Sequence, residues 1–178
     1  GITTPSDYQV TDLSLPTLRR LQEKYEIEAI FPVNSLQQGF IYHHVNFPED
    51  DAYRVQLLMD IEQNIDQACF VQAWELASER FPVLRTAFDW QETLLQVVTK
   101  GVSISQDHFT FWDLSDLTVS QQDNAIEELQ IEDRKKPFDL SQPGLLRFAL
   151  IKRNDNFYSL LKTEHHSIND GWSGPILL

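Results

Sequence analysis

Two adjacent histidines, His165 and His166, are the residues of this sequence best suited to chemistry, because Asp170 and Gly171 follow them closely. On a continuing strand, neighbouring side chains point to opposite faces, so one imidazole can face a site while the other packs inward. An imidazole titrates near neutral pH, and Gly171 permits a positive φ in the turn that carries Asp170. The cluster suits a site at a strand end, and a solvated polar strand end is the alternative that this pattern leaves open.

Two other kinds of site are weaker interpretations. Adjacent histidines on a strand rarely bind one metal ion, and His43-His44 forms a second such pair, so we predict no metal. Serine hydrolysis is disfavoured because Ser167 and Ser173 lack the GxSxG elbow. Cys69 is expected in the core-facing part of a helix, which disfavours a thiol nucleophile.

The elements that position the histidines are predicted to be a mixture of strands and helices. Asp66 is typical of a helix N-cap, Pro82 and Pro137 each end a helix, and Asn154-Asp155-Asn156 indicates a turn. Strands are expected at 53–62, 84–90, 94–99, 108–114, 145–153 and 157–164. In the first of these strands, one face carries Tyr53, Val55, Leu57, Met59 and Ile61. Helices are expected at 14–24, 35–43, 66–80 and 119–136. The buried side of the helix at 66–80 is expected to carry Val71, Trp74, Ala77 and Phe81. Since hairpins are present, we predict an α+β fold with a mixed, largely antiparallel sheet flanked by helices.

Length and charge limit the function classes. With 178 residues, 42% hydrophobic and 23% charged, the chain is expected to be one globular domain or one lobe of a larger one. A net charge of −13 disfavours nucleic acid and anionic membranes as partners. No apolar stretch is long enough to cross a bilayer. The single Cys69 fits a reducing compartment, and without a start Met or signal peptide the chain is expected to be an excised piece of a cytoplasmic protein.

Four stretches together resemble the condensation domains of nonribosomal peptide synthetases, which have the chloramphenicol acetyltransferase-like fold. The resemblance runs from about Ile27 to Leu178. The last stretch matches the HHxxxDGxS motif without a gap, and the second departs from RHxxLRTxF by having Phe81 in place of the histidine. The stretches are Phe31–His43, Arg80–Phe88, Phe138–Arg147 and His165–Ser173.

This resemblance implies an N-terminal lobe at residues 27–178, preceded at 1–26 by a lead-in linker and short helix, with the C-terminal lobe absent. The implied reaction joins an acyl or peptidyl thioester on an upstream carrier domain to the amine of an aminoacyl thioester on a downstream carrier. No cofactor would be bound directly, because phosphopantetheine arms of the carriers hold the substrates. An adjacent adenylation domain and the missing lobe are the further partners, and the isolated lobe is expected to be inactive.

The resemblance also implies residue roles. His166 matches the catalytic residue, either as the base that orients the amine and takes its proton or as electrostatic support for the tetrahedral intermediate. His165 is expected to be structural, and Gly171 to offer its N–H toward the oxyanion. Asp170 is expected to form a structural pair with Arg85. Trp172 and Ser173 are expected to line the tunnel wall.

Three alternatives remain at this point. An epimerization domain of the same family also carries HHxxxDG, and a non-catalytic recruitment module shares the fold, although such modules resemble a damaged motif. His43-His44 is similar to an extra motif of dual epimerization/condensation domains, but Glu49-Asp50-Asp51 stands where Gly-Asp is required. We interpret that pair as residues at a helix end.

Overall fold

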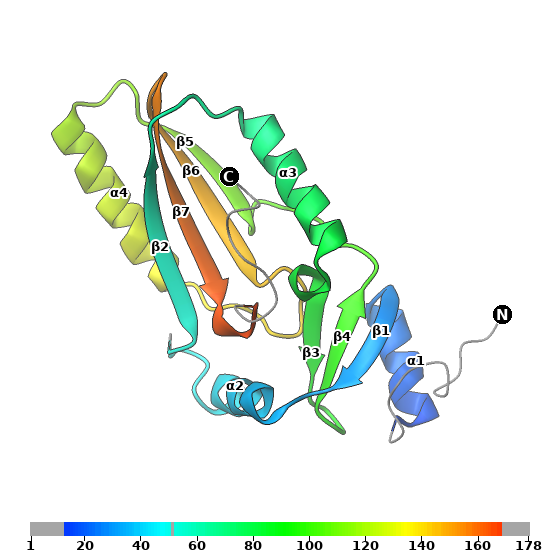
Figure 1. Ribbon diagram of the computed structural model, residues 1–178. Coiled ribbons are helices and arrows are strands. Elements are labelled where there is room, and N and C mark those ends of the chain that lie inside the picture. The colour runs from blue at the N-terminus through cyan, green and yellow to red at the C-terminus, as the bar shows by residue number, and fades with distance from the viewer. Residues whose placement is uncertain (1–12, 51, 169–178) are drawn as a thin grey trace.

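The computed structural model describes residues 13–50 and 52–168 (Figure 1). Its helices are α1 (Leu15–Lys24), α2 (Ser35–Asn46), α3 (Gln67–Arg80) and α4 (Val119–Arg134), with short 3₁₀ helices η2 (Pro82–Arg85) and η3 (His166–Ile168). Its strands are β1 (Ile27–Pro32), β2 (Arg54–Ile61), β3 (Thr86–Asp89), β4 (Leu95–Thr99), β5 (Phe109–Asp113), β6 (Leu146–Asn154) and β7 (Phe157–His165).

The strands form two sheets, one in the order β1-β4-β3 and the other in the order β2-β7-β6-β5. All neighbours are antiparallel except β5 and β6, which are parallel. The predicted hairpins are β3–β4 and β6–β7, so the prediction of a mixed, largely antiparallel α+β fold is confirmed. The division into two sheets was not predicted, because alternation along one strand does not identify its partner.

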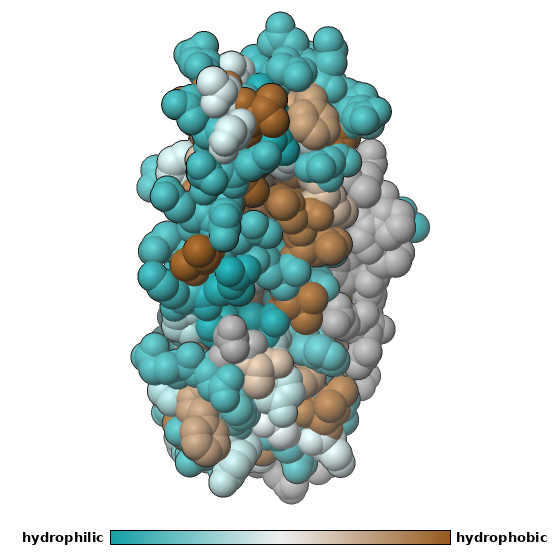
Figure 2. All heavy atoms as spheres, turned by 90° about the vertical axis from the view of Figure 1, so that its left-hand side faces the viewer, coloured by the Kyte–Doolittle hydropathy of each residue, from teal (hydrophilic) through white to brown (hydrophobic). Residues whose placement is uncertain are grey.

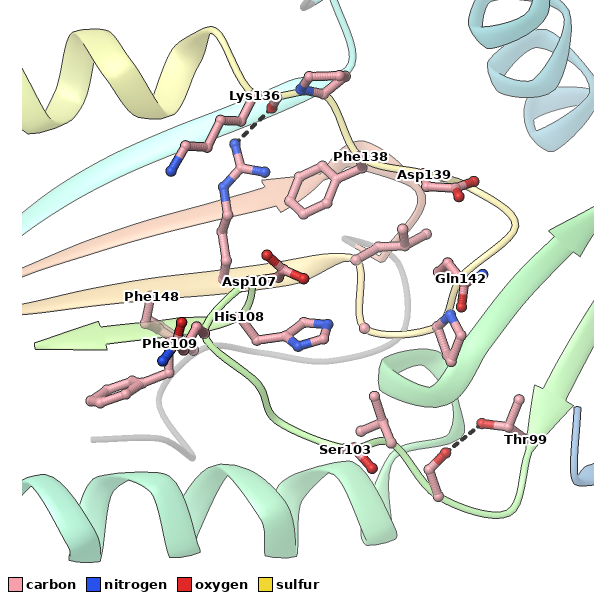
Figure 3. Close-up of a pocket in the computed structure, with 18 of the residues that line it drawn as sticks. Thr99, Ser103, Asp107, His108, Phe109, Lys136, Phe138, Asp139, Gln142 and Phe148 are labelled. Atoms are coloured by element: carbon pink, nitrogen blue, oxygen red, sulfur yellow. Dashed lines mark hydrogen bonds between the residues drawn. The ribbon is translucent and has the colours of Figure 1, made fainter.

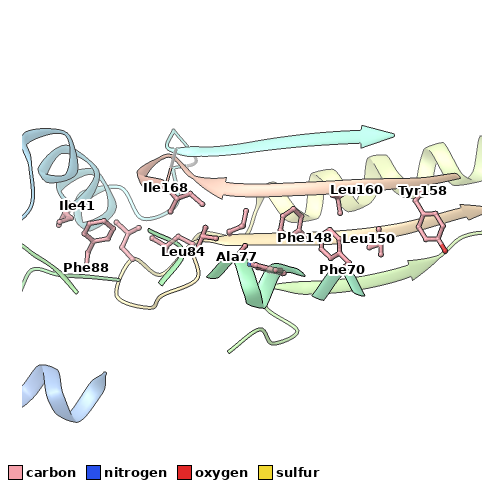
Figure 4. Close-up of a cluster of buried hydrophobic side chains, with 14 residues drawn as sticks. Ile41, Phe70, Ala77, Leu84, Phe88, Phe148, Leu150, Tyr158, Leu160 and Ile168 are labelled. Atoms are coloured by element: carbon pink, nitrogen blue, oxygen red, sulfur yellow. The ribbon is translucent and has the colours of Figure 1, made fainter. Parts of the chain in front are cut away.

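The four-stranded sheet is covered on both faces, which places its strands in the centre of the fold. Leu160 on β7 packs with Phe70 and Trp74 of α3 in the larger core cluster (Figure 4). Its neighbour Leu161 packs with Ile126 of α4 in a separate cluster. Since successive side chains of a strand point to opposite faces, α3 and α4 lie on opposite sides of the sheet.

Helix α1 covers the three-stranded sheet and belongs to the folded unit. Ser14 caps it by accepting a hydrogen bond from the Thr17 N–H. Arg20 makes a bidentate contact with Asp89 of β3, with both N–O distances 2.8 Å. Its apolar side is buried in a cluster with the sheet, formed by Leu13, Leu18, Leu21, Tyr25, Ile27, Ile30, Ala87, Leu95 and Val97. The described part of the lead-in segment is therefore packed against the lobe.

One sequence-based prediction about a helix face is wrong. Cys69 is exposed rather than in the core, because the buried stripe of α3 passes through Phe70, Trp74 and Ala77. On α2 the buried residues are Phe40 and Ile41, whereas Leu36 is half exposed. The N-cap of α2 is Asn34, in a capping box with Gln37.

Strand β2 is amphipathic, as predicted, but only part of its apolar face is covered. Val55 and Leu57 are 39% and 46% exposed, whereas Met59 and Ile61 pack against the larger core cluster. Among the described strands, β2 is at the edge of its sheet and pairs with β7 alone. Figure 2 shows apolar side chains exposed on this side of the molecule.

A partly buried carboxylate, that of Asp133, fastens the end of α4 to the sheet. Asp133 accepts hydrogen bonds from Arg147 on β6 at 2.6 Å, from Gln56 on β2 at 2.9 Å, and from Thr163 on β7. Burial alone would raise the pKa of Asp133, but these hydrogen bonds outweigh burial and lower it. Because three strands contribute, the group holds the start of β2 beside the end of β7, where the two histidines lie.

Candidate active site

The end of β7 is held in place by backbone hydrogen bonds on both sides. The His166 N–H donates to the Tyr53 carbonyl at 2.7 Å, just before β2. The His165 N–H donates to the Leu145 carbonyl at 3.0 Å, just before β6. The chain then leaves the strand through η3, and buried Ile168 anchors that turn in the larger core cluster. The position of the two imidazoles is therefore set by the sheet.

His165 faces the protein interior. It is 6% exposed and is surrounded by Phe40, Tyr53 and Phe138, with ring centroids at 5.4, 6.2 and 6.4 Å. Its Nδ1 accepts a hydrogen bond from the Ser167 N–H at 3.1 Å. Burial first, and then the positive charges of neighbouring histidines and an arginine, lower the pKa of His165 to about 3. This imidazole is neutral at physiological pH and buried, which is the environment of a structural residue.

His166 has a different environment. Its ring is partly exposed and lies 5.7 Å from the ring of Phe40 on α2. Its Nδ1 is buried and, among the residues that the structure describes, has no hydrogen-bond partner. The structure thus separates two histidines that the sequence presents as a pair. The other predicted motif residues, Asp170, Gly171, Trp172 and Ser173, lie outside the described residues.

Arg85 is buried at the junction of η2 and β3. Its guanidinium donates to the backbone carbonyls of Ser78, Glu79 and Thr99 and to the Glu28 carboxylate, the last at 2.6 Å. These contacts bind the end of α3 to strands β1 and β4. A structural role for Arg85 was predicted, but its pairing with Asp170 remains a prediction because Asp170 is outside the described part.

The sequence analysis did not assign the aromatic residues around the histidines. Phe40 contacts both imidazoles, Tyr53 supplies a carbonyl and a ring, and Phe138 lies under the guanidinium of Arg147 at 4.4 Å. Phe40 and Phe138 both occur within stretches that carry the family resemblance, which was the available signal. Glu164, directly before the histidines, was also missed, although a carboxyl beside an imidazole is itself a signal.

The second histidine pair lies in the last turn of α2, as interpreted from the sequence. His43 Nε2 is 3.4 Å from Asp50 Oδ2, and the His43 ring packs on Tyr53 at 5.0 Å. His44 packs on Trp90 at 5.5 Å, and burial lowers its pKa. Both imidazoles thus have packing partners within the lobe. Across the described ranges, no three side chains of His, Cys, Asp or Glu gather as a metal site requires.

A hollow of about 1,070 Å³ opens between the two sheets (Figure 3). Phe138 and Pro137 line it and also line the small pocket around His165, so the two spaces are neighbours. Lys136 and Asp107 are among its charged residues, and neither sign of charge dominates its wall. None of the helices in the described part of the chain combines the length and apolarity that crossing a membrane requires.

Comparisons with known proteins show the family to which this chain belongs. The family model described as "Condensation domain" matches residues 27–178. The chain belongs to the condensation-domain family. A similar relative is bacitracin synthase 3 of Bacillus licheniformis, 35% identical over 98% of this chain. Another is N-(5-amino-5-carboxypentanoyl)-L-cysteinyl-D-valine synthase of Amycolatopsis lactamdurans, 38% identical over 81% of this chain. This condensation-family chain spans only 3% and 4% of the lengths of these two relatives.

Solved structures show the same fold. The starter condensation domain of rhizomide synthetase superimposes with a TM-score of 0.68 at 19% identity, covering 79% of this chain and 34% of that one. A four-domain nonribosomal peptide synthetase superimposes with a TM-score of 0.67 at 23% identity, covering 80% of this chain and 10% of the other. The chloramphenicol acetyltransferase-like fold predicted from the sequence is therefore confirmed.

Proposed function

We propose that this chain is the N-terminal lobe of a domain that forms peptide bonds in nonribosomal peptide synthesis. The donor is an acyl or peptidyl thioester, and the acceptor is the amine of an aminoacyl thioester. Each is carried on the phosphopantetheine arm of a neighbouring carrier domain, in a cytoplasmic synthetase that also contains an adenylation domain. The boundaries proposed are 27–178 for the lobe, with residues 1–26 leading into it.

One observation carries this proposal: the structure buries His165 and leaves His166 partly exposed at the same strand end. A site that needs one base requires a single accessible imidazole in a fixed position. The backbone bond from His166 to Tyr53 and the contact with Phe40 supply that fixed position. The intact pair of histidines supports a catalytic domain over a recruitment module.

The proposed step is attack of the acceptor nitrogen on the donor carbonyl carbon. The C–N bond forms, the tetrahedral intermediate collapses, the C–S bond breaks, and the thiol of the donor arm leaves. His166 orients the amine and accepts the proton that the nitrogen must lose. Because Nδ1 of His166 is buried, Nε2 is the nitrogen that we assign to this proton transfer. A free α-amine has a pKa near 8, so a strong base is not required.

A single-turnover assay with loaded carriers tests the role of His166 in the complete two-lobed domain. His166→Ala is expected to lower the rate of amide formation by about 10²–10⁴-fold, the usual contribution of a positioned base, with an unchanged melting temperature. His108→Gln is the matched control, because His108 lies in the loop before β5, and its rate should equal that of the parent. Amide formation by His166→Ala at the parental rate would remove His166 from the mechanism.

A further inference from the structure

A carboxyl group lies beside the proposed catalytic histidine without a partner in the described structure. Glu164 is 7% exposed, and no described residue donates a hydrogen bond to it. Acidic side chains are almost never fully buried unless they are paired. Burial raises the pKa of Glu164, while the positive charges of Lys162 and His166 oppose that rise. The carboxyl oxygens of Glu164 are not among the fully enclosed atoms without a partner, so a hydrogen-bond donor from outside can reach them.

Strand geometry places this carboxyl on the side of the sheet that His165 does not face. Glu164 pairs across the sheet with Val55 of β2 and Leu146 of β6, and both neighbours are apolar. Side chains alternate along β7, so Glu164 points away from the pocket that holds His165. On a continuing alternation, Glu164 and His166 occupy the same side of the strand end. The electrostatic interaction between Glu164 and His166 agrees with this placement.

Within residues 13–50 and 52–168, neither the Glu164 carboxyl nor the buried His166 Nδ1 has a hydrogen-bond partner. An ionised carboxylate accepts hydrogen bonds and donates none. Its complement is a cation with N–H donors. An α-amine with a pKa near 8 reaches a neutral site mainly as ammonium, which offers three such donors.

We infer that Glu164 is the anionic subsite that binds the α-ammonium group of the acceptor, an inference that rests on the function proposed above. The carboxylate accepts hydrogen bonds from the ammonium and holds the nitrogen beside His166. No bond to Glu164 is made or broken. The bound ammonium first releases one proton to water, and the neutral amine then attacks the donor carbonyl carbon. His166 accepts the second proton that the nitrogen loses and passes it to the sulfur of the donor arm, which leaves as a thiol.

The test compares acceptor thioesters that differ only in the charge of the nucleophile, using the complete two-lobed domain. Leucyl and α-hydroxyisocaproyl thioesters are matched in shape, but only the first carries an ammonium. Glu164→Gln keeps the size of the side chain and removes the charge. Loss of a charge-assisted contact of about 1.5–3 kcal/mol should raise KM for the leucyl acceptor at least tenfold, and leave KM for the hydroxyacyl acceptor unchanged. Asp60→Asn is the control, because this carboxylate on β2 bonds to Ser159 at 2.7 Å near the other end of the sheet.

The outcomes separate this inference from the proposed function. If the parent forms no amide with any acceptor, the proposed function fails. If the parent forms amide and Glu164→Gln leaves the leucyl KM unchanged, only the ammonium subsite is overturned. A KM increase confined to a lysyl acceptor would assign the contact to a side-chain cation and overturn it equally. The melting temperature is an independent measure: without substrate, Glu164→Gln should melt at or above the parent, and a clear fall would show a partner within the protein.

Discussion

Acidification should destabilise the lobe through His165, and the structure gives the size of the effect. The unfolded chain has a histidine pKa of about 6.5, whereas burial lowers the pKa of folded His165 to about 3. Between these values the unfolded state binds one more proton than the folded state. Stability that is fully present above pH 6.5 is therefore lost as the pH falls toward 3. A pH of 5 lies about 1.5 units below the pKa of the unfolded imidazole. At about 1.36 kcal/mol per unit, the loss of stability is about 2 kcal/mol.

Urea unfolding followed by tryptophan fluorescence at pH 7 and pH 5 measures this effect. His165→Asn keeps an acceptor for the Ser167 N–H but does not titrate, so its stability should fall by about 2 kcal/mol less than that of the parent between these pH values. Phe138→Leu removes another ring from the same pocket and should weaken the lobe equally at both. Parallel pH–stability curves for the parent and His165→Asn would refute the assignment of His165 as a buried neutral imidazole.

Three further predictions follow from particular contacts. Arg85→Ala should lower the free energy of unfolding in urea by about 3–5 kcal/mol, because it removes a buried charge and the contacts that this charge supports. Glu28→Gln should lower it by less than about 1 kcal/mol, because Glu28 is half exposed. Equal losses for the two variants would contradict this reasoning. Gly144→Ala should destabilise the lobe by about 1–3 kcal/mol, because φ of Gly144 is +85° and the new Cβ would lie 2.6 Å from His108 Nε2. Gly39→Ala is the control: its Cβ would meet no described atom within 4 Å, so it should stabilise α2 by up to about 1 kcal/mol. The 178-residue chain should fold but form no peptide between two loaded carriers, and turnover above the no-protein background would show that a second lobe is dispensable.

The sequence predicts most elements because each has a local signal. Asp66 caps α3, and the Asn154-Asp155-Asn156 turn joins β6 to β7, and both depend on nearby residues. The two-sheet arrangement and the parallel pairing of β5 with β6 have no such signal, because they depend on contacts between distant segments. Cys69 was misplaced for a related reason: the period of a helix indicates a face, but the neighbouring elements decide which part of that face is covered.

The candidate site shows the same limit at the level of single side chains. Adjacent histidines have similar chemistry in the sequence, and alternation shows that they diverge without showing which of them is buried. That distinction comes from Phe40, Tyr53 and Phe138, which belong to three separate segments and meet around His165. The same enclosure that makes His165 unable to accept a proton at neutral pH fixes the strand end on which His166 stands. The division of roles between the two histidines is therefore a property of tertiary packing, and a variant that opens the His165 pocket should impair His166 through its position.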